Sequence, residues 1–236
     1  MVSDRSLIRP IGTGVFLALL LLAPGCGSRE GTRTEDSSGR AKTTSTASPK
    51  PARPRVVALG DSLTAGLGLD AASAYPALLQ NRLTADGFDY EVVNAGVSGD
   101  TSAGGLSRLD WALNGDVRVL IVALGGNDGL RALPPEELQQ NLATIIEKAQ
   151  ARRITVILAG MEAPPNFGRD YVVKFHRVYP ELANRYHVAF VPFLLEGVAG
   201  SETLNQRDGI HPTAEGATIV ADNIWAVLKP IVAAHP

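Results

Sequence analysis

The chain has 236 residues, of which 45% are hydrophobic, and a formal net charge of −2 at pH 7. This near-neutral charge, without a basic stripe interleaved with aromatic residues, argues against nucleic-acid binding. The single cysteine, Cys26, excludes an intramolecular disulfide bond. Residues 55–236 have the length of one domain, which is enough for a full hydrophobic core.

The first 26 residues are predicted to be a signal peptide. Arg5 and Arg9 precede an apolar run over residues 11–22, and the small-residue stretch 23–25 leads to Cys26. As a helix, this run would rise only about 18 Å, against roughly 30 Å of bilayer hydrocarbon, which argues against a permanent membrane span. We therefore expect export, with the protein located in the bacterial cell envelope.

Cys26 resembles the processing site of a bacterial lipoprotein, because it directly follows the apolar segment and a small residue. This resemblance implies a lipidated mature N-terminus that anchors the protein in a membrane, facing the periplasm or the exterior. The alternative is an ordinary signal peptide that is cleaved and lost.

Residues 27–54 are predicted to be a disordered linker. They consist almost entirely of Ser, Thr, Gly, Pro and charged residues, with alanine as the only aliphatic type. Such a segment cannot bury enough apolar surface to offset the entropy lost on ordering. Its lysines and arginines outnumber its acids, which would suit an anionic membrane surface, but a merely solvated linker is the preferred interpretation.

From residue 55 onward, short β-branched runs alternate with longer amphipathic stretches. The predicted buried parallel strands are Val56–Leu59, Glu91–Val93, Val117–Leu124, Ile154–Leu158 and Val188–Val191. The predicted helices are Ala74–Ala85, Ser102–Leu113, Pro135–Ala151, Tyr171–Tyr186 and Thr213–Leu228. This alternation predicts a three-layer α/β/α sandwich with right-handed crossovers. Ligands in such folds bind beyond the carboxyl ends of the strands, so we expect a site in the loops that follow them.

The loop after the first strand, Gly60-Asp61-Ser62-Leu63-Thr64-Ala65-Gly66, contains a candidate nucleophile. Glycine lets the backbone turn sharply and expose the Ser62 hydroxyl at the top of the sheet. Ser62 could equally cap a helix, since Ser and Asp both favour helix starts. Asp61 is interpreted as such a cap or as a brace within the loop.

A short turn before the last predicted helix, Asp208-Gly209-Ile210-His211-Pro212, contains a candidate general base. The turn can point the Asp208 carboxylate at Nδ1 of His211 and leave Nε2 free, as a general base requires. Most isolated Asp-x-x-His pairs are merely polar surface residues. The remaining histidines are interpreted as structural: His176, His187 and His235.

Two further loops can supply donors to a negatively charged oxygen formed during the reaction. Gly99 has no side chain to block a substrate from its backbone N–H, and Asn127 offers a side-chain amide directly after a strand. With the Ser62 N–H these make three donors, each typically worth ~3 kcal/mol in a transition state. The alternatives are a turn glycine and an asparagine that caps a helix.

Taken together, the four loops resemble the sequence blocks of SGNH (GDSL) hydrolases, which are named after a Ser, a Gly, an Asn and a His. The resemblance maps these residues onto Ser62, Gly99, Asn127 and His211, with Asp208 completing a catalytic triad. Residues 56–230 are especially similar to the bacterial thioesterase I/arylesterase/lysophospholipase branch. The shared segments are residues 60–63, 98–102, 124–131, 165–169 and 208–212. The resemblance implies a flavodoxin-like sheet of five parallel strands, and neither a metal nor a cofactor.

The resemblance also implies a serine esterase that cleaves carboxylic esters or thioesters through an acyl-enzyme. The segment 164–171 is similar to the one that lines the acyl-chain groove in this branch, so Met161 and Phe167 are candidate substrate contacts, with ordinary loop packing as the alternative. We expect acyl or aryl esters, including lysophospholipids, as substrates. Removal of acetyl groups from a cell-envelope polysaccharide is the alternative.

Two alternative hypotheses assign the chain to other functional classes. A magnesium-dependent phosphoryl-transfer enzyme could use Asp61, Asp128 and Asp208, since carboxylates at strand ends often hold hard cations, but the first strand lacks an Asp-x-Asp pair. A non-catalytic envelope module could bind glycan or lipid, although the complete set of loops favours an enzyme. The oligomeric state is not predicted.

Overall fold

The computed structural model describes residues 53–234, so the predicted signal peptide, the lipidation site at Cys26, most of the linker and His235 lie outside the described residues. The described part contains one sheet of five parallel strands in the order β2-β1-β3-β4-β5. The strands are β1 (Arg55–Gly60), β2 (Glu91–Gly96), β3 (Val117–Ala123), β4 (Thr155–Ala159) and β5 (Ala189–Val191). This order is the flavodoxin-like one, and it confirms the predicted fold class.

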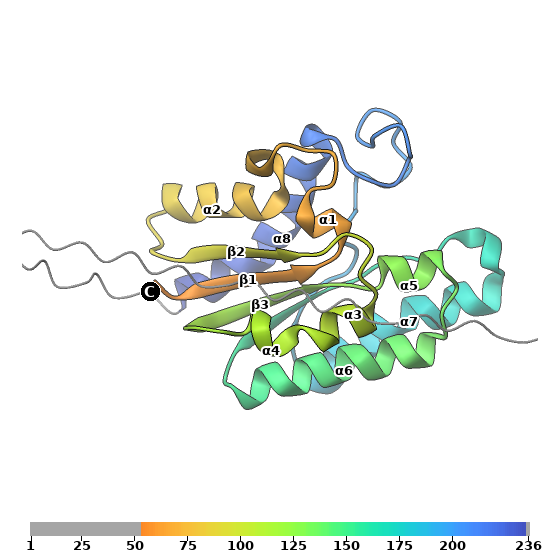
Figure 1. Cartoon of the computed structure of the whole chain (residues 1–236), viewed down its shortest axis with the longest axis horizontal. Helices are drawn as coiled ribbons and strands as arrows, with labels where there is room; N and C mark the ends of the chain where they lie inside the picture. The colour runs from red at the N-terminus through yellow and green to blue at the C-terminus, as the bar shows by residue number, and fades with distance from the viewer. Residues whose placement is uncertain (1–52, 235–236) are drawn as a thin grey trace, which may run out of the picture. The chain divides into compact units, whose positions relative to one another are not determined.

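Helices cover both faces of the sheet (Figure 1). One face carries α2 (Tyr75–Ala85) and α8 (Ala214–Ala233). The other face carries α3 (Ser102–Ser107), α4 (Leu109–Ala112), α6 (Pro135–Ala151) and α7 (Arg169–Tyr186). Because both faces are covered, β3 is buried at every residue except Arg118, as its continuous apolar sequence indicates.

The predicted start of α6 is confirmed. Pro135 occupies the first turn, where a missing N–H costs nothing, and Glu136 and Glu137 lie next to the positive end of the helix dipole. The side of α6 that packs into the core consists of residues at helical spacing: Leu138, Leu142, Ile145, Ile146 and Ala149.

Helix α8 is the one helix within residues 53–234 that is long and apolar enough to cross a membrane by length and composition. It packs against α2, β4 and β5. Its buried side chains belong to the main hydrophobic core and include Val220, Ala221, Ile224, Leu228 and Val232. Core packing therefore accounts for its hydropathy.

Several predicted boundaries are wrong. The single helix predicted over residues 102–113 is two helices, because Arg108 leaves helical geometry with φ −109° and ψ 8°. The adjacent pair Gly104 and Gly105 lowers the helix propensity of this segment. Helix α8 continues beyond Leu228 to Ala233 despite Pro230.

Four short helices were not predicted. Two follow strands directly: α1 (Ser62–Ala65) after β1 and α5 (Gly126–Leu130) after β3. The others are the 3₁₀ turns η1 (Ala71–Ser73) and η2 (Pro165–Phe167). All are too short to show a helical repeat of apolar residues.

The strand order places a topological switch point between β1 and β3. The chain leaves β1 towards β2 on one side, and it then crosses back to β3 on the other side. The loops after β1 and β3 therefore turn away from each other and leave a crevice at the carboxyl edge, where ligands of such sheets bind.

Gly125, between β3 and α5, lies where the packing at this edge leaves no room for a side chain. Its φ is +112°, and a Cβ there would lie 2.0 Å from the hydroxyl oxygen of Tyr179, which donates to the Leu124 carbonyl oxygen at 3.0 Å. We predict that Gly125→Ala lowers the free energy of unfolding by about 3 kcal/mol or more, measured by urea denaturation, because it adds a clash and a lost buried hydrogen bond to backbone strain.

The control is Gly87→Ala, where φ is +81° and no atom lies within 4 Å of the added Cβ. Backbone strain alone should cost about 1 kcal/mol there. Equal losses for the two variants would contradict the packing argument.

Candidate active site

The loop after β1 presents Ser62 at the carboxyl edge of the sheet. Asp61 is the N-cap of α1, and its Oδ1 accepts the Leu63 N–H at 3.0 Å, which confirms its interpretation as a cap. Gly60 has no room for a side chain, since a Cβ would lie 1.9 Å from Thr64 Oγ1 and 2.8 Å from the Ala123 carbonyl oxygen. This close packing fixes the direction in which Ser62 leaves the strand.

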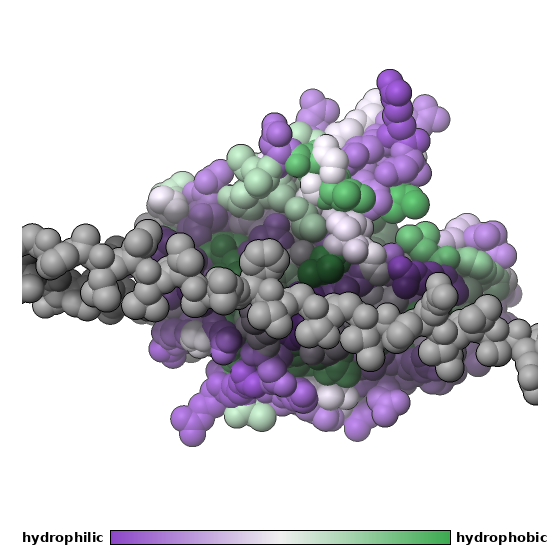
Figure 2. Space-filling view, in the orientation of Figure 1, coloured by the Kyte–Doolittle hydropathy of each residue, from purple (hydrophilic) through white to green (hydrophobic). Residues whose placement is uncertain are grey.

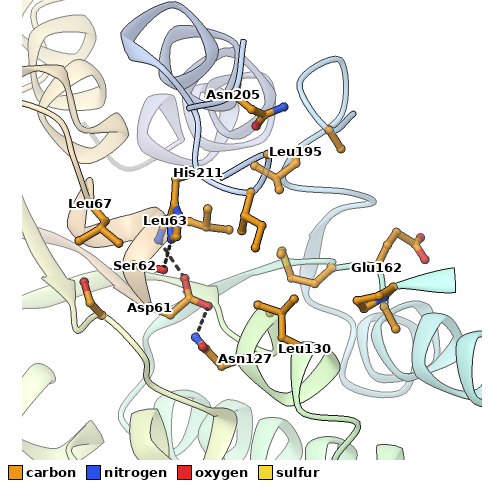
Figure 3. A pocket seen from close by; sticks show the side chains of 18 of the residues that line it. Asp61, Ser62, Leu63, Leu67, Asn127, Leu130, Glu162, Leu195, Asn205 and His211 are labelled. Atoms are coloured by element: carbon orange, nitrogen blue, oxygen red, sulfur yellow. Dashed lines mark hydrogen bonds between the residues drawn. The ribbon is translucent and has the colours of Figure 1, made fainter. Parts of the chain in front are cut away.

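The structure brings Ser62, His211 and Asp208 together. Figure 3 shows Ser62 beside His211. The Oγ of Ser62 lies 2.9 Å from Nε2 of His211, and Nδ1 of His211 lies 2.7 Å from Oδ2 of Asp208. A neutral imidazole with its proton on Nδ1 donates to Asp208 and can accept the serine proton at Nε2. The arrangement can therefore deprotonate the Ser62 hydroxyl.

Asp208 is held as a carboxylate by its own turn. The backbone N–H groups of His211 and Ile210 donate to Oδ1 at 3.0 and 2.9 Å, and together with the imidazole they lower the pKa of Asp208 to about 2. Hydrogen bonds to the charged form favour it. Asp208 is therefore ionised at neutral pH and gives His211 an anionic partner.

The three candidate oxyanion donors lie around the same cavity. The backbone N–H groups of Ser62 and Gly99 donate to no protein acceptor within residues 53–234. Gly99 has φ +86°, a conformation that favours glycine. Nδ2 of Asn127 donates to the Asp100 carbonyl oxygen at 2.9 Å and, over a longer 3.3 Å, to Oδ2 of Asp61. Asn127 does not cap a helix, contrary to the alternative considered for it.

The pKa of Asp61 is shifted in the opposite direction to that of Asp208. Burial raises its pKa to about 6, against the lowering effects of the Leu63 N–H, the charge of His211 and the Asn127 amide. Only 2% of Asp61 is exposed. Its contact with Asn127 links the loops after β1 and β3, residues 66 positions apart in the chain.

A cavity of about 500 Å³ opens beside Ser62 and His211, a volume typical of small-molecule sites. Its walls are mostly apolar, and they include Leu130, Met161, Ala163, Phe193 and Leu195. At its mouth Leu67, Leu130 and Ile210 are between 41% and 47% exposed. Figure 2 shows hydrophobic atoms on the surface beside α1 and α5, where this mouth lies.

The two candidate substrate contacts occupy different places. Met161 is 7% exposed and lines the cavity. Phe167 is 37% exposed, packs edge-on against Tyr171 and is not part of the cavity lining. The leucines and Phe193 of the wall were not predicted, although apolar residues in loops that follow strands are a signal that could have pointed to them.

The carboxylates considered as magnesium ligands bind other groups. Asp128 accepts the N–H and the hydroxyl of Ser102 at 2.8 and 2.6 Å, while Asp61 and Asp208 have the partners described above. Within residues 53–234, no three His, Cys, Asp or Glu side chains are grouped as metal ligands. His176 pairs with Glu162 at 2.6 Å, and His187 ends α7 with φ 52°.

Comparison with known proteins finds one matching family and several similar relatives. The profile of the GDSL-like Lipase/Acylhydrolase family matches residues 58–219. The chain is 48% identical to the esterase TesA of Pseudomonas aeruginosa over 178 residues, 75% of this chain and 89% of the relative. It is 39% identical to thioesterase 1/protease 1/lysophospholipase L1 of Escherichia coli K12 over 175 residues, 74% of this chain and 83% of the relative.

A solved structure shows the same fold. The crystal structure of AlinE4, an SGNH-hydrolase family esterase, aligns with a TM-score of 0.64 at 44% identity. The alignment covers 79% of this chain and 99% of that chain.

The raised pKa of Asp61 predicts a pH-dependent stability. The folded protein binds the Asp61 proton more tightly than the unfolded chain, so Asp61 contributes stability below pH 3.8 that is lost as pH rises through about 6. Between pH 4 and 7, the free energy of unfolding of the wild type should fall relative to Asp61→Asn by about 2 kcal/mol.

Urea denaturation of both proteins across this pH range measures the difference, and the titrations of groups that do not interact with Asp61 cancel because both proteins share them. Parallel curves for the two proteins would show that burial does not raise the pKa of Asp61.

Proposed function

The chain belongs to the GDSL-like lipase/acylhydrolase family, and we propose that Ser62, His211 and Asp208 are the catalytic residues of this carboxylic ester hydrolase. The observation that carries the proposal is the 2.9 Å contact between Ser62 Oγ and His211 Nε2, backed by the 2.7 Å contact from Nδ1 to Asp208. A hydroxyl, an imidazole and a carboxylate in this order form a proton-transfer chain that activates serine.

In the first half of the reaction, Ser62 Oγ attacks the carbonyl carbon of the ester while Nε2 of His211 takes the hydroxyl proton. The imidazolium formed is stabilised by Asp208, which stays ionised. The tetrahedral intermediate then collapses, the bond from carbon to the leaving oxygen or sulfur breaks, and His211 returns the proton to the leaving group. An acyl-enzyme on Ser62 remains.

In the second half, a water molecule attacks the acyl-enzyme and gives a proton to His211. The second tetrahedral intermediate releases the carboxylic acid, and His211 returns its proton to Ser62. In both halves the negative oxygen faces the N–H groups of Ser62 and Gly99 and the amide of Asn127. Asn127 can share one of its hydrogens at the longer contact, the 3.3 Å one to Asp61.

We further propose that the substrates are acyl or aryl esters, including lysophospholipids, and thioesters. Support comes from the apolar cavity of about 500 Å³, which suits a hydrocarbon chain with its ester at Ser62. It also comes from relatives named esterase and thioesterase 1/protease 1/lysophospholipase L1.

The location of the enzyme is a proposal from the sequence alone. The leader over residues 1–26 supports export, and Cys26 supports an N-terminal lipid anchor joined to the hydrolase domain by the linker 27–54. Mass spectrometry of the mature N-terminus tests the anchor: a diacylated or triacylated Cys26 is expected, and a free N-terminus beyond Cys26 would contradict it.

Ser62→Ala should abolish esterase activity on an aryl ester while the protein remains folded, because Ser62 supplies the hydroxyl that lies 2.9 Å from His211 Nε2. Circular dichroism and the urea midpoint confirm folding. A folded Ser62→Ala protein with wild-type turnover would overturn the assignment.

Asn127→Ala should lower kcat by about a hundredfold, as expected for the loss of one oxyanion donor, with a small change in KM. Steady-state kinetics on the same aryl ester provides the measurement. An unchanged kcat would remove Asn127 from the site.

The acyl cavity predicts a preference among substrates. The value of kcat/KM should rise from acetyl to medium-chain aryl esters, since each buried CH₂ contributes up to ~0.8 kcal/mol. A panel of aryl esters of increasing chain length, together with an acetylated polysaccharide, measures this. Highest activity on the acetylated polysaccharide would favour the O-acetylesterase function instead.

A further inference from the structure

Arg108 lies at the junction of α3 and α4 and binds three groups at the carboxyl edge of the sheet. Its Nε donates to Oδ2 of Asp100 at 2.6 Å, its Nη1 to the Ala95 carbonyl oxygen at 2.7 Å, and its Nη2 to the Gly60 carbonyl oxygen at 2.8 Å. The side chains of Arg108 and Asp100 are only 17% and 18% exposed. Such charge-assisted bonds are strong and weakly screened by water.

Two of the three groups that Arg108 holds are close in sequence to a candidate oxyanion donor. Gly60 is two residues before Ser62, and Asp100 directly follows Gly99. The carbonyl oxygen of Asp100 accepts the shorter of the two bonds from Asn127, at 2.9 Å. One guanidinium therefore links the loops that supply the Ser62 N–H, the Gly99 N–H and the Asn127 amide.

We propose that Arg108 is a positioning residue that sets the three oxyanion donors relative to one another, an inference that rests on the proposed esterase function. The three donors lie in the segments that follow three different strands, β1, β2 and β3, and no short segment of chain holds them together. A displacement of about 1 Å in one donor is enough to lose much of its effect on the transition state.

Arginine suits this position better than lysine. The planar guanidinium presents separate N–H groups in fixed directions, so it can bind a carboxylate and two carbonyl oxygens at once. An ammonium is a point charge on a flexible stem and cannot meet three acceptors in these directions. The break between α3 and α4 places Arg108 where its side chain reaches back to the ends of β1 and β2.

The same two strands offer a matched control at their other ends. Arg55 Nε donates to Glu91 Oε2 at 2.8 Å, and its Nη1 donates to the Asn114 carbonyl oxygen at 3.2 Å. This pair also joins β1 to β2, but it lies at their amino ends, away from Ser62. Arg55→Gln and Arg55→Lys therefore test the effect of losing a strand-linking arginine without touching the donors.

The experiment compares steady-state kinetics of Arg108→Gln, Arg108→Lys and the two Arg55 variants on a soluble aryl ester, with folding checked by circular dichroism. Arg108→Gln should lower kcat by about a hundredfold with KM changed less than about twofold, because the donors act on the transition state. Arg108→Lys should lower kcat by about tenfold or more, and both Arg55 variants should keep the wild-type kcat. Folded Arg108 variants whose kcat matches that of the Arg55 variants would overturn the proposal.

A double-mutant cycle tests whether Arg108 acts through Asn127. In an Asn127→Ala background, Arg108→Gln should cost clearly less in kcat than in the wild type, since one of its targets is already gone. Losses that multiply fully would contradict this route. If Arg108→Gln does not fold, Asp100→Asn replaces it in both tests, with a smaller fall in kcat expected and an unchanged kcat as the contrary result.

Failure of the proposed function is recognised separately. It would appear as wild-type activity in Ser62→Ala, whatever the Arg108 variants do.

Discussion

The site depends on one contact between distant parts of the chain, the 2.9 Å approach of Ser62 Oγ to His211 Nε2 across 149 positions. The fold makes this approach by two separate means. The tight packing around Gly60 fixes Ser62 at the end of β1. The turn before α8, closed by two backbone hydrogen bonds to Asp208, fixes the imidazole above it. The flavodoxin-like strand order supplies the crevice between them, so fold and chemistry are joined at the switch point.

Two aspartates near the site show how local environment divides roles between identical side chains. Asp208 lies in an exposed turn and accepts two backbone N–H groups, which lower its pKa and keep it charged beside the imidazole. Asp61 is buried under α1, where the loss of water raises its pKa. The charged Asp208 suits the stabilisation of an imidazolium. Asp61 joins the loops after β1 and β3 through Asn127, and its effect on the free energy of unfolding depends on pH. Neither role follows from the residue type alone.

The sequence predicted the parts of the fold that leave a periodic or compositional signal. A strand such as β3, buried on both faces, requires a continuous β-branched run, and α6 requires apolar residues at helical spacing. The loop that contains Ser62 was found because its short pattern directly follows a strand, and the turn that contains His211 because its pattern directly precedes the last helix. Helices of four or five residues, such as α1 and α5, give no such signal. The contacts of Arg108 with Gly60 and of Asp61 with Asn127 join residues 48 and 66 positions apart, and only the folded chain brings them together.

The proposed nucleophile is Ser62, activated by His211. The most direct measurement is peptide mass spectrometry after reaction with a fluorophosphonate that carries an aryl or alkyl group, performed on the wild type and on His211→Ala. We expect a single phosphonyl adduct on Ser62 in the wild type, formed far more slowly when His211 is replaced. An adduct on another residue, or the same rate of labelling without the imidazole, would contradict it.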